Sequence, residues 1–573
     1  MIADFIERKI KYILILPLVL LVLGLALFPS VYGYYLSVND VNLSNFQVKT
    51  FNGLENFLAT LGDTDFRRAL GFSALFAVCT TVPEVVLGLG IALWFNRRAL
   101  PGKGALISLM LLPIMVSPAL LGIMFRLMLN EFVGVLAYYL KVVGLPGAEL
   151  LSPQYVFWTL VAIDVVQWTP FTFLILYSAL QTVSKELYEA ASVDGANPIQ
   201  LFRYITVPTI APFIAITAFL RVIDSFKVFD MIYVLTGGGP GTITTSISIY
   251  IYRMAFNTGD LGRASAASIL LLLPAVGAAR LRAAAHRAKG RGVTMGKDRL
   301  RRFVDAAVWY LVALLILLVF AFPLVNTFFT SLKSNLDIIA TPPTWAFTPV
   351  TTHYENVLYA AGYDFAAFFR NSAFVALGAS TLVVLACLPA AYSIVRFRTG
   401  GQQLFAFIIS LRLLPPVIFT VPMFILFQAL GMLDSVRGLA LVNTLFNTPL
   451  ALLLFVGFIQ DLPKEIEEAA MIDGASTWGV MRYVVLPLLL PGIAVVMVMT
   501  FLWSWNEFLF SLVLTFNQAT TVTVGASLFV TAWGVRWGDI AAAITLSLIP
   551  TLVFTFFVQR YLVSGLTLGA IKS

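Results

Sequence analysis

Long apolar runs separated by short polar segments make up most of the chain. A membrane-spanning helix needs about 20 mostly apolar residues. Segments of this kind number twelve, at 12–35, 67–95, 105–129, 156–180, 207–235 and 261–280, and again at 303–331, 368–395, 404–430, 436–459, 486–515 and 537–559. The pattern predicts an all-α polytopic membrane protein with two six-helix transmembrane halves.

Basic residues support this helix count. When the N-terminus, with Arg8, Lys9 and Lys11, is placed in the cytoplasm, helix parity assigns every loop to one side of the membrane. Of the 37 Lys and Arg residues, 23 then fall on inside segments, as the positive-inside rule requires. We therefore expect both termini to be cytoplasmic. The first run, 12–35, ends without a small-residue cleavage site and is expected to span the membrane rather than to be removed.

Composition excludes several classes of function. Hydrophobic residues make up 60% of the chain and charged residues 12%, whereas a soluble domain has about 25% charged residues. The net charge of +8 is explained by cytoplasmic loops, so no nucleic-acid partner is expected. The two cysteines lie in apolar runs and the two histidines are isolated, at Cys79, Cys387, His286 and His353. We expect neither a disulfide framework nor a metal site.

One polar segment occurs twice between apolar runs. Residues 185–212 align without gaps to residues 464–491 at a constant offset of 279, with twelve of the 28 positions identical. The chain therefore consists of two related halves. Because each half has an even number of spans, both are expected to lie the same way up, related by a pseudo-two-fold axis along the membrane normal.

The repeat predicts three parts of the chain. The first half covers 1–280, with its polar segment at 185–208, and the second half covers 303–573, with its polar segment at 464–487. The linker at 281–302 is strongly basic, which indicates a cytoplasmic location. Met295 is either the start of a once separate polypeptide or an ordinary linker residue.

The polar segment reads as a helix–turn–helix that lies against the membrane. Residues 185–194 have helix-forming composition and Gly195 supplies a stop. Pro198 suits the first turn of a second short helix, and Pro208 begins the next span. The segment could simply join two spans. A second copy that retains the charged positions favours a docking surface for a partner, with acids that offer charge-assisted hydrogen bonds.

The two copies, EAASVDGANPIQLFRYITVP at 189–208 and EAAMIDGASTWGVMRYVVLP at 468–487, resemble the EAA loop of permease subunits of binding-protein-dependent ABC importers. In that family each EAA loop docks one ATP-binding cassette subunit. The resemblance implies two such partners on the cytoplasmic side. The E-A-A and glycine positions match the family's pattern, and the Asp and Arg positions are identical in both copies. The docking candidates are therefore Glu189, Ala190, Ala191, Asp194, Gly195, Arg203, Glu468, Ala469, Ala470, Asp473, Gly474 and Arg482.

Other motifs resemble the carbohydrate-uptake branch of the family, of the maltose, trehalose and glycerol-phosphate type. FKVFDMIYVLTGGGP at 226–240 resembles the larger permease, whereas SWNEFLFSLVLT at 504–515 and GLTLGAIKS at 565–573 resemble the smaller one. The resemblance implies both permeases fused in one chain of a prokaryotic cytoplasmic membrane. Substrate would arrive on an external sugar-binding protein.

No phosphate-binding loop for ATP is present in the sequence. The motif G-x-x-x-x-G-K-[ST] cradles phosphate with its backbone amides, but Lys297 is followed by Asp298 and the required earlier glycine is Arg291. ATP and Mg are therefore expected on partner subunits, with no cofactor in this chain. We also find no catalytic constellation and expect no enzyme.

Charged residues within the fifth span, Arg221, Asp224, Lys227 and Asp230, alternate in sign at i, i+3. Neighbours at that spacing can pair, so the series either fixes helix packing or lines a polar pathway. In the resembled family the sugar lies in the larger-type half, on the helices that flank the EAA loop. Carried to this sequence, the resemblance implies Asp164, Gln167 and Ser225 as substrate-path residues. Further candidates are Asp224 of the charge series and the aromatic residues Trp168 and Phe226, which could stack on a sugar ring. The parallel positions in the second half are Asn443, Asn447, Asn506 and Glu507.

Two other classes of function remain as alternatives. An ion-coupled secondary transporter of a small polar solute would use Asp164 and Glu507 as coupling carboxylates, but it has no use for two ATPase-docking loops. A membrane enzyme would need a nucleophile with a base, or a metal cluster, and the sequence offers neither.

Overall fold

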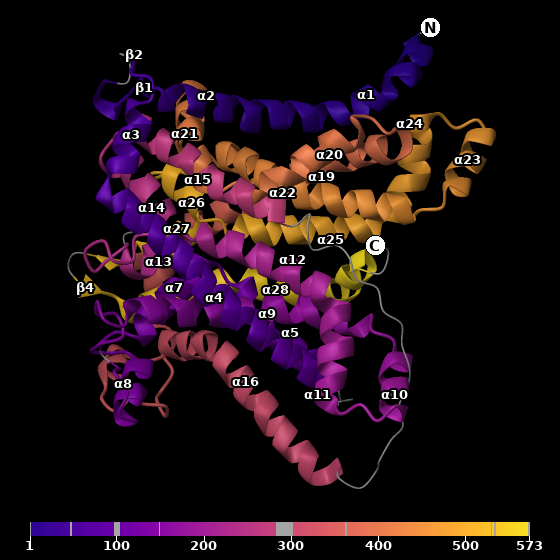
Figure 1. The fold of residues 1–573 in the computed structure, drawn as a ribbon. Coiled ribbons are helices and arrows are strands. Elements are labelled where there is room, and N and C mark those ends of the chain that lie inside the picture. The colour runs from indigo at the N-terminus through magenta and orange to yellow at the C-terminus, as the bar shows by residue number, and fades with distance from the viewer. Residues whose placement is uncertain are drawn as a thin grey trace. The chain divides into compact units, whose positions relative to one another are not determined.

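Helices long enough to span a membrane dominate the structure, a computed structural model (Figure 1). It describes residues 2–45, 49–96, 103–147, 149–281, 302–360, 364–528, 530–531 and 534–570. Within these residues nine helices are long and apolar enough to cross a membrane, and a bent pair, Gly401–Leu413 with Pro416–Ala429 at 99°, would make a tenth. The all-α polytopic class expected from the sequence is confirmed.

Each of the twelve expected segments falls on helix, but several are broken rather than continuous. The segment 105–129 forms α5 (Lys103–Met110), α6 (Leu112–Met115) and α7 (Pro118–Met128). The break between α6 and α7 leaves Val116 and Ser117 extended ahead of Pro118, because proline disfavours helical backbone at the residue before it. Gln167 Nε2 donates to the carbonyl oxygen of Val116 at 3.2 Å.

The segments 207–235 and 486–515, expected as single spans, are also broken. The first forms α12 (Val207–Phe226) and α13 (Asp230–Thr236), and the second forms α25 (Leu486–Trp505) and α26 (Leu509–Leu514). Backbone carbonyls at membrane depth need partners within the protein. Hydroxyl groups from later in the chain supply them: Ser246 donates to the Val228 carbonyl at 2.8 Å and Thr523 to the Glu507 carbonyl at 2.7 Å.

The described chain folds into two compact units that do not coincide with its two sequence halves. Unit 1 comprises residues 1–63, 251–272 and 364–525, and unit 2 comprises 64–250, 273–363 and 526–573. Each unit therefore holds the central spans of one half together with the first span of the other half. Unit 1 also holds the start of the sixth span of the first half, and unit 2 holds the sixth span of the second half. The division expected at 281–302 separates the two copies of the repeat in sequence. Residues 282–301 of that linker lie outside the described residues.

Unit 1 begins with a long N-terminal helix and is completed by helices of the second half. Its elements are α1 (Ile2–Val22), η1 (Leu23–Leu27), α2 (Phe28–Ser37), β1 (Asn39–Asp40), η2 (Leu43–Asn45), β2 (Thr50–Phe51), α3 (Glu55–Gly62), η4 (Arg253–Asn257), the first part of α15 (Leu261–Leu281), α19 (Phe365–Phe397), α20 (Gly401–Ser410), η7 (Leu411–Leu413), η8 (Pro416–Phe419), α21 (Thr420–Ala429), α22 (Val436–Asp461), α23 (Lys464–Ile472), α24 (Thr477–Val480), η9 (Met481–Val485), α25, α26 and most of α27 (Val522–Ser527). Strands β1 and β2 pair antiparallel, with Asn39 opposite Phe51.

Unit 2 is built around the central helices of the first half. Its elements are α4 (Thr64–Asn96), α5, α6, α7, α8 (Val135–Val142), α9 (Val156–Gln181), α10 (Lys185–Val193), α11 (Pro198–Leu201), η3 (Phe202–Thr206), α12, α13, most of α14 (Ile247–Tyr252), α16 (Arg302–Ser331), α17 (Asn335–Ile339), α18 (Thr352–Glu355), η6 (Asn356–Ala360), β3 (Val530–Thr531), β4 (Gly534–Val535) and α28 (Trp537–Ala570). Strands β3 and β4 pair antiparallel.

Apolar clusters hold the first span of each sequence half in the unit formed mainly by the other half. In unit 1, Leu36 at the end of the N-terminal span packs with Val421 and Ile425 of α21. In unit 2, Phe320 of α16 belongs to a buried cluster that includes Phe173 of α9. Lipid tails are as apolar as these side chains, so close packing rather than removal from water stabilises such contacts. Each first span therefore packs against the half that it did not come from.

A loop of unit 1 is held by one carboxylate, Asp434, in the turn between α21 and α22. The backbone N–H groups of residues 516–519 donate to its two oxygens at 2.9–3.1 Å. Asp434 lies in the left-handed region at φ +50°, which a short polar side chain tolerates. Its own N–H donates to the Leu514 carbonyl at 2.8 Å, so turn and loop are joined in both directions.

Acidification is expected to release this loop. Burial raises the pKa of the Asp434 carboxyl, but the four backbone donors outweigh burial and hold its pKa below the ordinary 3.8. A depressed pKa contributes stability that is present above the unfolded value and is lost as the pH falls through the folded one. Thermal unfolding of the solubilised chain should therefore lose stability below about pH 4, and Asp434→Asn should remove part of that pH dependence.

Amide hydrogen exchange tests whether the loss of stability arises in the loop at 516–519. Asp434→Asn should accelerate exchange of these amides at neutral pH relative to the wild type. Asp65→Asn is the control, since the pair of Asp65 with Arg68 is exposed and spans 3.6 Å. Equal protection of 516–519 in the wild type and in Asp434→Asn would contradict the anchoring role.

Candidate functional site

The two copies of the polar segment have the same secondary structure at every boundary. Helices α10 and α23, α11 and α24, the π-helical turns η3 and η9, and the spans α12 and α25 all begin and end 279 residues apart. The expected helix–turn–helix is therefore present in both units. Each short helix pair runs without a break into a span, so a force on the pair is carried into that span.

A left-handed glycine makes the turn within each copy. Gly195 has φ +81° and Gly474 has φ +90°, which glycine adopts without steric cost. Side-chain caps start the second short helix: Asn197 accepts from the Gln200 N–H at 2.9 Å, and Ser476 accepts from the Gly479 N–H at 3.1 Å. The turn and cap explain why two short helices form here in place of one long helix.

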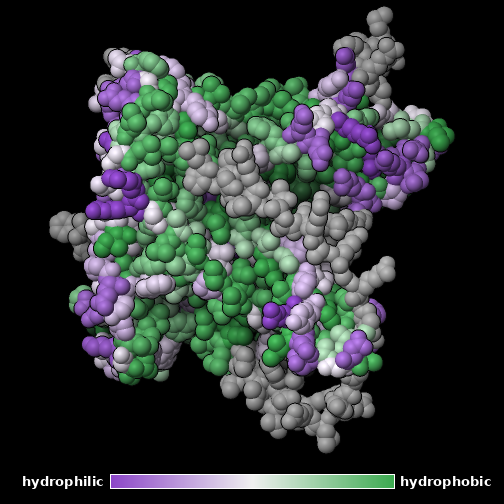
Figure 2. Space-filling model, viewed as in Figure 1, coloured by the Kyte–Doolittle hydropathy of each residue, from purple (hydrophilic) through white to green (hydrophobic). Residues whose placement is uncertain are grey.

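The docking residues expected from the sequence are half-buried or exposed. Glu189, Ala190, Ala191 and Ala470 are half-buried, whereas the exposed set is Asp194, Gly195, Arg203, Glu468, Ala469, Asp473, Gly474 and Arg482. Figure 2 shows hydrophilic side chains gathered over α23 and α24, in contrast to the apolar surface of the long helices. These residues are accessible to a partner, and their docking role stays a prediction.

Sequence reasoning missed three apolar positions that both copies expose. In the first copy Val193 is 85% exposed, Ile199 76% and Tyr204 68%; the residues 279 positions later are Ile472 at 85%, Trp478 at 52% and Tyr483 at 73%. We call each set of three the exposed apolar triplet. The alignment shows that all three positions are apolar or aromatic in both copies, but other positions such as Leu201 and Val480 are apolar too, so the alignment alone does not identify the exposed ones.

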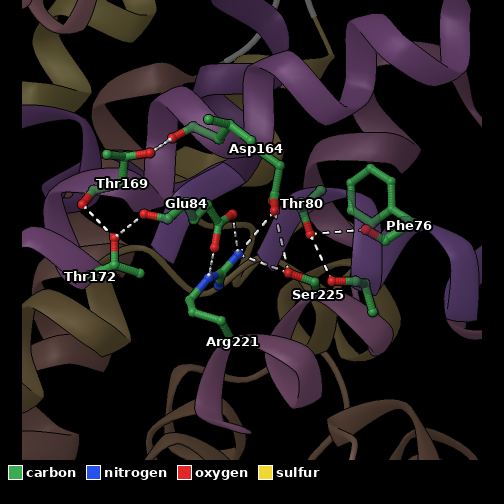
Figure 3. Close-up of polar contacts among 10 residues, drawn as sticks. Phe76, Thr80, Glu84, Asp164, Thr169, Thr172, Arg221 and Ser225 are labelled. Carbon is green, nitrogen blue, oxygen red and sulfur yellow. Dashed lines mark hydrogen bonds and ion pairs between the residues drawn. The ribbon is translucent and has the colours of Figure 1, made fainter. Parts of the chain in front are cut away.

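Two of the substrate-path candidates of the first half, Asp164 and Ser225, lie with Arg221 and Glu84 in a buried ionic cluster (Figure 3). Arg221 of α12 donates from Nε to Glu84 Oε2 at 2.5 Å and from Nη2 to Asp164 Oδ2 at 2.9 Å. Its Nη2 also lies 2.8 Å from Ser225 Oγ, which lies 3.4 Å from Asp164 Oδ2. All four residues are at most 3% exposed. Helices α4, α9 and α12 are thereby joined through one guanidinium.

Sequence reasoning did not find Glu84, the second acid of this cluster. It lies within the apolar run of α4, and Thr172 of α9 donates to its carbonyl at 2.8 Å. One helical turn later, Gly88 lets α4 and α9 approach closely, since a Cβ atom there would overlap the Thr172 side chain. A lone acid in an apolar span was the available signal, because such residues normally face a partner inside the bundle.

The ladder of charges expected along the fifth span is present in part. Lys227 pairs with Asp224 at 3.0 Å, as i, i+3 spacing predicts. The ion pairs of Arg221 are made instead with acids of α4 and α9. The cation of Arg221 also lies over the ring of Trp168, 4.6 Å from its centre. Phe226 is the last residue of α12.

Gln167 and the candidates of the second half mostly bond to backbone. Besides its bond to Val116, Gln167 has a buried Oε1 with no partner in the described residues. Asn447 donates to the Asn443 carbonyl at 2.8 Å and to Ser504 Oγ at 3.2 Å. Glu507 accepts from the Phe510 and Ser511 N–H groups at 2.6 and 3.0 Å and so caps α26. Asn506 caps the end of α25.

Both halves of the chain match one protein family. The family described as "Binding-protein-dependent transport system inner membrane component" matches residues 64–337 and 382–568. The chain belongs to this family. Each match contains one complete copy of the polar segment, so the chain carries the transport component twice. The fusion expected from the sequence repeat is confirmed.

Relatives of known name cover one half of the chain each. The trehalose/maltose transport system permease protein MalF of Thermococcus litoralis is 37% identical over 265 residues, 46% of this chain and 89% of the relative. The probable ABC transporter permease protein y4oQ of Sinorhizobium fredii is 36% identical over 252 residues, 44% of this chain and 80% of the relative. The sulfoquinovosyl glycerol transport system permease protein SmoH of Agrobacterium fabrum is 33% identical over 254 residues, 44% of this chain and 88% of the relative.

Proposed function

We propose that the chain is the transmembrane permease of an ATP-driven importer for a sugar or oligosaccharide. Two separate ATP-binding cassette subunits bind it, one at each copy of the polar segment. The repeated helix pair with its exposed apolar triplet is the observation that carries this proposal, since isolated apolar residues are common on surfaces but an equivalent triplet in both copies indicates an interface.

The ATPase partners supply the energy and the chemistry. ATP and Mg reside on those subunits, and this chain acts as a transport subunit without enzymatic activity. Because each helix pair continues directly into α12 or α25, movement of a bound ATPase tilts a span and alternates access to the pathway. An ion-coupled transporter has no comparable need for two matched docking segments.

A carbohydrate is the proposed cargo because relatives are named for trehalose and maltose and for sulfoquinovosyl glycerol. The sugar is delivered by an external binding protein. The chain lies in a prokaryotic cytoplasmic membrane with both termini and both polar segments inside, as the distribution of basic residues indicates. The buried cluster of Arg221 and its partners then lies beside the pathway in the first half.

Copurification and uptake test the proposal together. An ATPase of separate sequence should copurify with the chain, and vesicle uptake of a panel of labelled sugars that includes trehalose and maltose should stop when ATP is replaced by a non-hydrolysable analogue. Uptake that continues without ATP hydrolysis and collapses with a proton or sodium ionophore would instead establish the ion-coupled alternative.

A further inference from the structure

Arg396, in the last turn of α19, joins three elements of unit 1. Its Nε donates to Glu467 Oε1 of α23 at 2.8 Å, and Nη2 pairs with the same oxygen at 2.5 Å. Nη2 also donates to the carbonyl of Leu462, directly after α22, at 3.1 Å. Tyr392, one turn earlier on α19, donates to Glu467 Oε2 at 2.9 Å. The side chains of Arg396 and Glu467 are only 8% and 6% exposed.

The matching position in the first copy is attached by different chemistry. Tyr188 stands 279 residues before Glu467, and its hydroxyl lies 2.9 Å from Thr206 Oγ1 in the turn that leads into α12. Leu187 and Tyr188 pack against the apolar cluster of unit 2 that contains Phe95 and Phe173. Helix α10 is therefore seated mainly by apolar packing, whereas α23 is seated by a buried ion pair.

These two attachments resist motion differently. A guanidinium that donates to a carboxylate and to a backbone carbonyl fixes direction as well as distance. Separating a buried pair also exposes each charge to an environment with no replacement partner. Apolar packing is non-directional, so an element seated that way can rotate while it stays buried.

We propose that Arg396 and Glu467 are positioning residues that make α23 move as one body with α19 and the end of α22. On the proposed function, on which this inference rests, an ATPase bound at the second copy displaces α19 and α25 together. The first copy passes its movement chiefly to α12. The two docking segments thus couple one pair of ATPases to different sets of spans.

Distances between spin labels test the rigid connection directly. With Cys79 and Cys387 replaced by alanine, labels are placed at Leu385 on α19 and Ile466 on α23, whose native side chains are 61% and 44% exposed. The full-length chain should give one narrow distance. Arg396→Gln with Glu467→Gln removes both charges, so no uncompensated charge stays buried, and loss of the narrow distance is expected. Glu465→Gln, an exposed acid on the same helix, should retain it.

If the double variant Arg396→Gln with Glu467→Gln does not assemble, Arg396→Lys is the second test. A lysine ammonium keeps the charge but lacks the planar guanidinium that reaches both Glu467 and the Leu462 carbonyl. A narrow distance retained in either variant overturns the proposal, as does an equal broadening in Glu465→Gln. Adding MgATP and vanadate to the ATPase-bound chain should leave the wild-type distance unchanged and add a second distance in the variant. If no ATPase copurifies, the proposed function fails while the measurement on the chain alone still decides the rigid connection.

Discussion

Arg221→Met should prevent stable assembly of unit 2. Arg221 is the cation that faces both Glu84 and Asp164, and all three side chains are buried. Removing one partner of a buried ion pair costs about 3–5 kcal/mol, because the other charge is left uncompensated. We expect little folded protein in detergent and early aggregation on heating, measured by fluorescence-detected size exclusion.

A matched control and a rescue separate charge from packing. Lys227→Met removes the cation directly after the end of α12. Its pair with Asp224 is partly exposed, with side chains 14% and 29% accessible. Its loss should cost less than about 1 kcal/mol. Combining Arg221→Met with Glu84→Gln and Asp164→Asn removes the unpaired charges and should restore most of the folded fraction. Wild-type stability in Arg221→Met alone would show that the cluster does not hold the three helices together.

Only part of the buried ionic cluster around Arg221 could be predicted from the sequence. Asp164 and Ser225 were predicted as neighbours in function, and they lie within hydrogen-bonding distance of the same guanidinium. Glu84 could not be joined to Arg221, 137 positions later, because periodicity within a helix relates only residues three or four apart. The partner of a buried charge on another helix is decided by packing between helices.

The exchange of first spans was also beyond the sequence. Hydropathy identifies apolar runs and the repeat aligns them. The sequence of an apolar run does not indicate which of the two units the resulting helix packs in. Leu36 packs with Val421 and Phe320 lies in the cluster with Phe173, and both contacts cross the halves. The break at 116–117 has a local cause in Pro118. Its partner could not be assigned, because Gln167, which donates to the free Val116 carbonyl, lies 51 positions later on another helix.

The docking segments were predicted more completely, because their determinants are local. A glycine stop, a proline start and an N-cap residue fix both short helices within about 20 residues of chain. The charged positions kept in both copies indicated a surface. Exposure of the apolar triplet could not be predicted, because the alignment shows which residues are apolar but not which of them point to the surface. That depends on how the short helices pack.

The double variant Val193→Lys with Ile472→Lys should lose ATPase binding, because it changes one residue in each exposed apolar triplet. Both residues are the last of their short helix and are 85% exposed, so the substitutions should change the stability of the fold little. A lysine at a helix C-terminus is even favourable to the helix dipole. In an interface, however, each substitution removes an apolar contact of roughly 1.5–3 kcal/mol and buries an unpaired charge. Binding should weaken about tenfold or more for each segment.

A pull-down of the ATPase subunits, followed by ATP-driven uptake in vesicles, measures this loss. Leu61→Lys combined with Val142→Lys is the control, because both residues are exposed near the end of short helices, at 49% and 63%, outside the polar segments. Glu189→Ala with Glu468→Ala tests the acids of the same surface and should also reduce ATPase association, since an acid there can pair with a base on the partner. A lysine pair that binds and transports like the control, in a chain that does hold an ATPase, would place the docking surface elsewhere.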